Sequence, residues 1–260
     1  MMTALMRALR AEIQKLNRTL VLAIVVLAPL GAGAMLFFNI IRSDNDRPDP
    51  WNWMMNAMIF VWGYLALPLF IVLESALLTG LDHNANGWKH LYALPIPRWT
   101  IYVAKLIIML VITLISTLLM VLVLWLVGMF SQLIQIKPEI NFLAPLPWGA
   151  ILTGVLVSYF ASWLIMAIHL WIGMYFSNFT IPVGIGLVAV VASALGVNNI
   201  DWAYAFPWTL AGITLRQVYE YMQQNLANVV PVPTLLLGMV GGIVVAAVGC
   251  WFMLRQDVLS

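Results

Sequence analysis

Residues 101–130 read IYVAKLIIMLVITLISTLLMVLVLWLVGMF, and this stretch decides the fold class. Apart from a lysine near its start, the stretch contains no charged residue. A helix that crosses a membrane needs about 20 consecutive, predominantly apolar residues. A run of this length and composition therefore predicts a transmembrane helix.

Five more apolar stretches lie on either side of this one, at residues 19–41, 54–78, 147–176, 179–197 and 234–254. The fourth and fifth spans in chain order are separated only by Ser177 and Asn178, which predicts a tight hairpin. We find no internal repeat and no linker. The sequence thus predicts an all-α, polytopic membrane protein with six transmembrane helices in a single membrane domain, residues 1–260.

The composition of the whole chain supports a membrane protein. The sequence is 63% hydrophobic and 8% charged, with a mean hydropathy of +0.98. Soluble domains carry about 25% charged residues, so this chain cannot cover a water-facing surface. The only cysteine, Cys250, excludes an internal disulfide and is expected to be a small core residue.

Lysine and arginine are distributed unequally between the two sides of the predicted spans. Cytoplasmic flanks carry an excess of these residues, so we expect both termini in the cytoplasm. An even number of spans agrees with this orientation and with a location in the inner or plasma membrane. The richer side holds Arg7, Arg10, Lys15, Arg18, Lys89, Arg98, Lys105 and Arg255, and the poorer side holds Arg42, Arg47, Lys137 and Arg216.

Residues 1–18 predict a helix in the membrane interface. Leu5, Leu9, Ile13 and Leu16 share one face, and the basic residues point elsewhere. Such a helix lies with its apolar side toward lipid and its basic side toward the headgroups. The alternative is a simple basic topology signal.

The loop at residues 79–100, TGLDHNANGWKHLYALPIPRWT, predicts a docking element. Asp82 or Asn84 is placed to cap a short helix that begins near Asn86. An exposed helix with aromatic anchors suits a groove on a partner protein. The alternative is an ordinary polar loop whose tryptophan sits at the headgroup level. The candidate docking residues are Asp82, Asn84, Asn86, Gly87, Trp88, Lys89, Leu91 and Tyr92.

The extracytoplasmic segment at residues 198–233 is long and rich in aromatic residues. It fits a re-entrant hairpin, whose backbone must be buried against protein at membrane depth. A surface helix with an aromatic belt fits equally well.

Two ionisable residues lie inside predicted spans. Glu74 is near the cytoplasmic end of the second span, where pairing with Arg98 or Lys105 would relieve the cost of its burial. We expect these three residues to have a gating or structural role, with simple boundary placement of Glu74 as the alternative. A lone His169 in the fourth span is expected to form a hydrogen bond to a neighbouring helix rather than to bind a metal.

The chain lacks the motifs of an enzyme or an ATPase. It has no G-x-x-x-x-G-K-[ST] phosphate loop, no H-E-x-x-H motif and no cluster of cysteine and histidine. We therefore predict no catalytic residue, no metal site and no cofactor in this chain. Energy for uphill transport has to come from elsewhere.

The segment from Glu74 to Lys105 resembles the type-two ABC exporter permeases. The shared pattern is an acidic residue after the second span, an Asn/Gly-rich turn with Trp-Lys, a Leu-Pro, a basic residue and a lysine that opens the third span. Here it reads Asp82-His83-Asn84, Asn86-Gly87-Trp88-Lys89, Leu94-Pro95, Arg98 and Lys105. The Leu-Pro-Ile-Pro-Arg run is especially similar to the branch with lantibiotic-immunity permeases, and Glu12–Lys15 before the first span also fits.

This resemblance implies a mechanism. Two permeases, identical or paralogous, pair in the lipid bilayer, and each binds an ATP-binding subunit through its coupling loop. ATP and Mg²⁺ belong to that partner, and no nucleic acid is involved. Substrates of the family include lipids, peptides and amphipathic drugs, and the branch indicates antimicrobial-peptide resistance. Two other hypotheses stay open: an ion-coupled carrier that uses Glu74 and His169, and an intramembrane enzyme or non-transporting scaffold.

Overall fold

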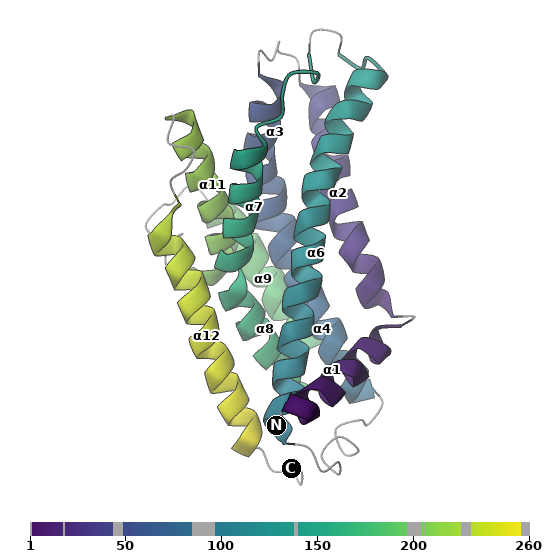
Figure 1. The fold of residues 1–260 in the computed structure, drawn as a ribbon, viewed down its shortest axis with the longest axis vertical. Coiled ribbons are helices and arrows are strands. Elements are labelled where there is room, and N and C mark those ends of the chain that lie inside the picture. Colours follow the sequence, from purple (N-terminus) through teal and green to yellow (C-terminus); the bar gives the residue numbers. More distant parts are fainter. Residues whose placement is uncertain are drawn as a thin grey trace.

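The computed structural model describes residues 2–17, 19–43, 49–84, 97–137, 140–196, 204, 206–224 and 230–255. These residues form a bundle of helices, and the described part contains no strand, which confirms the all-α class (Figure 1). The helices are α1 (Met2–Leu16), α2 (Leu20–Arg42), α3 (Pro50–Met58), the π-helix η1 (Ile59–Ala66), α4 (Leu67–Asn84), α6 (Arg98–Leu133), α7 (Trp148–Ala161), α8 (Trp163–Tyr175), α9 (Thr180–Gly196), the 3₁₀-helix η2 (Pro207–Thr209), α11 (Leu210–Gln223) and α12 (Val232–Arg255).

Five helical segments of the described chain are long and apolar enough to cross a membrane. They are Leu20–Arg42, Pro50–His83, Arg98–Leu133, Trp148–Tyr175 and Val232–Arg255. The predicted fifth span corresponds to α9, whose 17 residues reach about 25 Å, less than the roughly 30 Å of a bilayer core. Five of the six predicted spans therefore coincide with helical segments that are long and apolar enough to cross a membrane, and α9 is a short apolar helix. In Figure 1, α1 and the C-terminal end of α12 lie at the same end of the molecule.

The second span is built from three helices in series: α3, η1 and α4. The Asp49 side chain caps α3 by accepting a hydrogen bond from the Asn52 amide at 3.0 Å, and Pro50 occupies the first turn. The π-helix η1 then packs on α11, where a Cβ atom on Gly63 would lie 2.7 Å from the Cα atom of Gly212. Two facing glycines let the two backbones touch.

The first span, α2, is held against the long helix α6. Pro29 removes one backbone donor from α2, and the freed carbonyl of Val25 accepts a hydrogen bond from the Ser116 hydroxyl at 3.0 Å. Near the same level, a Cβ atom on Gly33 would lie 2.3 Å from the side chain of Val123. The side of α2 that faces α6 is thus closely packed.

The segment at residues 198–233 contacts the helix bundle through the first half of α11. Residues Leu210 to Leu215 of α11 are buried against η1 and α7, and the Ser193 hydroxyl of α9 donates to the Trp208 carbonyl at 3.2 Å. The first half of α11 is therefore packed into the bundle, whereas the Arg216 and Glu220 side chains farther along the helix are 43% and 48% exposed. Whether the segment re-enters the membrane or lies at its surface stays a prediction.

Candidate functional site

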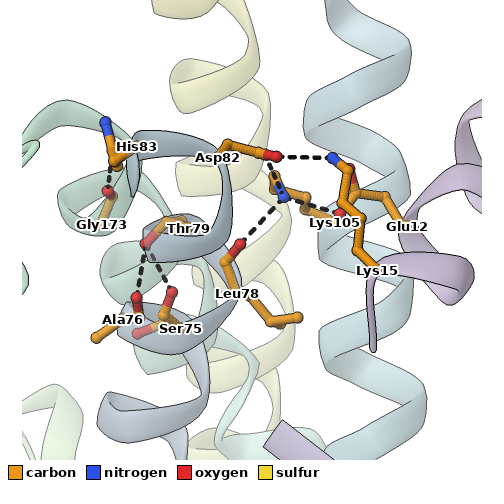
Figure 2. A network of polar contacts seen from close by, with 10 residues as sticks. All are labelled: Glu12, Lys15, Ser75, Ala76, Leu78, Thr79, Asp82, His83, Lys105 and Gly173. Carbon is orange, nitrogen blue, oxygen red and sulfur yellow. Dashed lines mark hydrogen bonds and ion pairs between the residues drawn. The ribbon is translucent and has the colours of Figure 1, made fainter. Parts of the chain in front are cut away.

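Four charged side chains from three helices meet at the end of the bundle where α1 lies (Figure 2). Glu12 and Lys15 come from α1, Asp82 from the last turns of α4, and Lys105 from the third turn of α6. We refer to these four residues as the ion-pair ring. Two anions and two cations cancel, so the ring carries no net charge.

Lys105 is at the centre of the ring and is fully buried. Its Nζ lies 2.8 Å from Glu12 Oε2, 2.6 Å from Asp82 Oδ2 and 3.2 Å from the Leu78 carbonyl oxygen. An ammonium group has three donors, and here it has three oxygen atoms around it. A buried charge is tolerated when it is paired and hydrogen-bonded in this way.

Lys15 closes the ring from the outer side. Its Nζ donates to Glu12 Oε1 at 2.6 Å and to Asp82 Oδ1 at 2.7 Å, so each carboxylate bridges both ammonium groups. Its side chain is 27% exposed. Burial lowers the pKa of Lys15, but the negative charge of Glu12 and the hydrogen bonds to Asp82 and Glu12 outweigh it, and the pKa is raised overall.

The sequence of α1 brings Glu12 into the interior. Ala8, Glu12 and Leu16 are buried at four-residue spacing and form the face that packs on α6. The face that packs on the bundle is only partly the predicted apolar face: Leu16 is buried in it, whereas Ile13 is 53% exposed, as a side chain turned toward lipid would be, and Glu12 is 4% exposed. An apolar side chain such as Ile13 or Met6 is stable on the outside of a helix that lies in a lipid interface.

The ring lies at the base of the predicted coupling loop. Asp82 is two residues before the end of α4, and Lys105 is seven residues after the start of α6. Glu12 accepts a hydrogen bond from Lys105 of α6, and Lys15 donates one to Asp82 of α4. As a result, α1 is fastened both to the last turns of α4 and to the first turns of α6, the helices on either side of the predicted loop.

The same end of α4 is also fixed to α8. His83 Nε2 lies 3.2 Å from the Gly173 carbonyl oxygen, and this hydrogen bond requires a proton on Nε2. Thr79 packs beside it, where a Cβ atom on Gly173 would lie 2.7 Å from the Thr79 hydroxyl oxygen. The base of the loop is thus anchored on two sides.

A family model described as "ABC-2 family transporter protein" matches residues 8–193, which are 186 of the 260 residues. The chain belongs to this ABC-2 family. No curated protein and no solved structure matches it. The matched range begins in α1 and includes the whole ion-pair ring, and ABC-2 permeases normally pair with an ATP-binding subunit.

The predicted docking residues of this ABC-2 protein are only partly described. Asp82 belongs to the ring instead of acting as a helix cap, and Asn84 is the last residue of α4, because α4 extends six residues into the predicted loop. The remaining candidates lie outside the described residues, and their role stays a prediction. They are Asn86, Gly87, Trp88, Lys89, Leu91 and Tyr92.

The predicted pairing of Glu74 with Arg98 or Lys105 is wrong. Glu74 is fully buried, and its Oε2 accepts a hydrogen bond from the Thr113 hydroxyl at 2.7 Å. On α6, Lys105 lies about 12 Å and Arg98 about 22 Å along the helix axis from Thr113. Lys105 is engaged in the ring instead, and Glu74 Oε1 has no hydrogen-bond partner among the described residues.

His169 of α8 is buried and forms the expected hydrogen bond to another element. Trp208 of η2 donates from Nε1 to His169 Nε2 at 3.1 Å, and the two rings meet edge-on with centroids 5.5 Å apart. The histidine therefore joins α8 to the segment that follows α9. No hydrogen bond connects His169 with Glu74 in the described part of the chain.

Proposed function

We propose that this chain is the membrane-spanning permease subunit of an ATP-driven exporter. The observation that carries the proposal is the ion-pair ring, which fastens α1 to both flanks of the loop where the resemblance places the ATPase contact. Motion of that loop would then move three helices as one unit, which is what coupling to an external motor requires.

The energy source in this proposal is a separate ATP-binding chain. The sequence has no phosphate loop, so this chain hydrolyses no ATP by itself, and ATP and Mg²⁺ are held by the partner. A second copy or a paralogue completes the permease. The exported molecule is hydrophobic or amphipathic, such as a lipid, a peptide or a drug, and the lantibiotic-immunity resemblance favours an antimicrobial peptide.

Co-purification with the cognate ATP-binding subunit tests the proposal. Truncating one aromatic anchor at the core of an interface costs roughly 2 kcal/mol or more, so Trp88→Ala should weaken binding of the subunit on the order of 30-fold. Tyr92→Ala should act in the same direction. Trp148→Ala is the matched control, because Trp148 is 48% exposed at the start of α7, at the other end of the molecule.

Unchanged recovery with both loop variants would show that the contact is misplaced. Failure of any ATP-binding subunit to bind the unmodified chain would remove the proposed function itself. An equal loss of binding with Trp148→Ala would show that the effect is not specific to the loop, and the loop assignment would then be rejected.

The proposal places the α1 end of the molecule in the cytoplasm, as the distribution of lysine and arginine predicts. In a Cys250→Ser background, Asn17→Cys marks the α1 end and Leu143→Cys marks the other end; both positions are exposed. A membrane-impermeant maleimide added to intact cells should label Leu143→Cys only. Labelling of Asn17→Cys alone would invert the topology.

A further inference from the structure

An apolar groove runs between the first and second spans. Its volume is about 470 Å³, which lies within the range of ligand sites. One wall comes from α2, between Ile24 and Met35, and the other from η1 and α4, between Val61 and Leu73. Every residue that lines the groove is apolar.

The packing of the neighbouring helices explains why the groove is open. On one side, α2 is held to α6 by the Ser116–Val25 hydrogen bond and by the close contact at Gly33. On the other side, η1 is held to α11 by the Gly63–Gly212 contact. Each wall thus has a close contact of its own with a further helix, in addition to the contacts of α2 with η1 and α4. Small residues also line the α2 wall, and a Cβ atom on Gly31 would meet no atom within 4 Å.

The length of the groove decides what fits in it. Ile24 and Met35 are eleven residues apart, or about 16 Å along α2. That is about half of a bilayer core of roughly 30 Å, the depth of one leaflet. A transmembrane helix of a second copy would run the full depth of the bilayer, whereas one alkyl chain matches the groove in length and polarity.

We propose that this groove binds one alkyl chain of an amphiphile that enters sideways from the bilayer. The groove lies along the middle of α2, because Ile24 is four residues after the start of the helix and Met35 is seven residues before its end. Water is absent at this depth, and an apolar groove there is stable only when hydrocarbon fills it. For transport, this inference rests on the proposed function, and among the substrate classes named there the groove favours a lipid or another amphiphile with an alkyl tail over a peptide.

Photolabelling tests the binding site without the ATP-binding subunit. The purified chain in phosphatidylcholine nanodiscs would be irradiated with a lysophosphatidylcholine that carries a diazirine on its alkyl chain. We expect label on the groove walls and loss of at least about five-fold in Gly31→Leu, whose side chain fills the empty space. Gly184→Leu on α9 is the matched control, because a Cβ atom there also meets nothing within 4 Å.

A second measurement uses the unmodified protein, so it does not depend on how the variants fold. Excess unlabelled lysophosphatidylcholine should compete for the label in the groove in a saturable way. Equal labelling of all lipid-facing helices, absence of competition, or unchanged labelling in Gly31→Leu would overturn the proposal. Disulfide formation between two copies through Gly31→Cys would also overturn it, by showing that a second copy fills the groove.

The transport part has its own readout. In the complex with the ATP-binding subunit, the same amphiphile should stimulate ATP hydrolysis, and Gly31→Leu should abolish this stimulation whereas Gly184→Leu should retain it. If no ATP-binding subunit binds, the proposed function fails, while photolabelling still tests whether the groove binds an alkyl chain. If labelling succeeds and stimulation is absent, the groove is an alkyl-chain binding site, and its role in substrate selection is rejected.

Discussion

Two regions of this molecule bury acidic side chains in different ways. At the base of the bundle, Glu12 and Asp82 share two ammonium groups, and every close partner is a full charge of opposite sign. Further into the second span, Glu74 has one hydroxyl partner, Thr113, and a second oxygen atom without a partner in the described chain. The ring fastens three helices, whereas the isolated carboxyl contributes little to holding the bundle together.

The difference shows that burial alone does not identify a functional acid. A charge-balanced set of buried ions has a clear structural role, because removal of one member leaves an uncompensated charge. A single acid inside a membrane is costly and contributes little to packing, which makes it a candidate for function. Substitutions in the two regions should therefore separate stability from activity.

The largest effect is expected for Lys105→Met. Methionine keeps much of the length of the side chain but leaves two buried carboxylates with one ammonium group. Breaking a buried pair in this way costs about 3–5 kcal/mol, so α1 should detach from α6. In a Cys250→Ser background, Ala8→Cys reports this detachment, because Ala8 is buried in the α1 face that packs on α6. Its maleimide labelling should accelerate by at least about 100-fold.

Two controls accompany this measurement. Asn17→Cys on the exposed side of the same region should be labelled at an unchanged rate. The double variant Glu12→Gln with Lys105→Met restores one cation and one anion, and it should recover part of the lost protection. Unchanged labelling of Ala8→Cys in Lys105→Met would mean that the ring does not hold α1.

A smaller effect is expected for Lys15→Met. Lys15 is 27% exposed, and partly exposed ion pairs contribute about 0.2–1 kcal/mol. Labelling of Ala8→Cys should therefore rise less than about five-fold. An effect as large as that of Lys105→Met would show that both cations are equally indispensable, and the distinction between the inner and outer halves of the ring would be lost.

The pKa of Lys15 also predicts how this contribution depends on pH. Because the folded pKa is raised above the usual value of about 10.4, the stabilisation is fully present below that value. It is lost only as pH rises through the raised pKa. The ratio of Ala8→Cys to Asn17→Cys labelling should therefore show no loss of the Lys15 contribution between pH 7 and pH 9, and a marked rise within that window would contradict the raised pKa.

The spans were predictable from sequence because continuous hydropathy reports contact with lipid directly. The ring was not, because Lys15–Asp82 and Lys105–Glu12 join residues 67 and 93 positions apart. The available signal was a Glu12–Lys15 pair before the first span together with Asp82 and Lys105 on the loop flanks. The burial of Glu12 was not predicted either, because the apolar periodicity of α1 does not show which polar residue faces the bundle. The burial of α11 also depends on tertiary contacts, such as Gly63 with Gly212.

The smallest effect on stability is expected for Glu74→Gln. The amide has nearly the same shape as the carboxyl and retains an oxygen atom for the Thr113 hydroxyl, so the change in free energy of unfolding should stay below about 1 kcal/mol. Labelling of Ala8→Cys should not change, because no ring member contacts Glu74 among the described residues. Thr113→Val is the contrasting variant: it leaves the whole carboxyl without a donor and should cost about 1–3 kcal/mol.

At Glu74, we expect substitution to affect transport activity more than stability. If the buried acid serves transport, Glu74→Gln and Glu74→Ala should reduce substrate-stimulated ATP hydrolysis of the complex while assembly with the ATP-binding subunit is intact. The measurement is the hydrolysis rate at equal amounts of assembled complex. Wild-type rates in both variants would make Glu74 a tolerated residue near the end of a span. A loss of assembly would place Glu74 with the ring as a structural acid, because the isolated carboxyl would then be holding helices together through Thr113 alone.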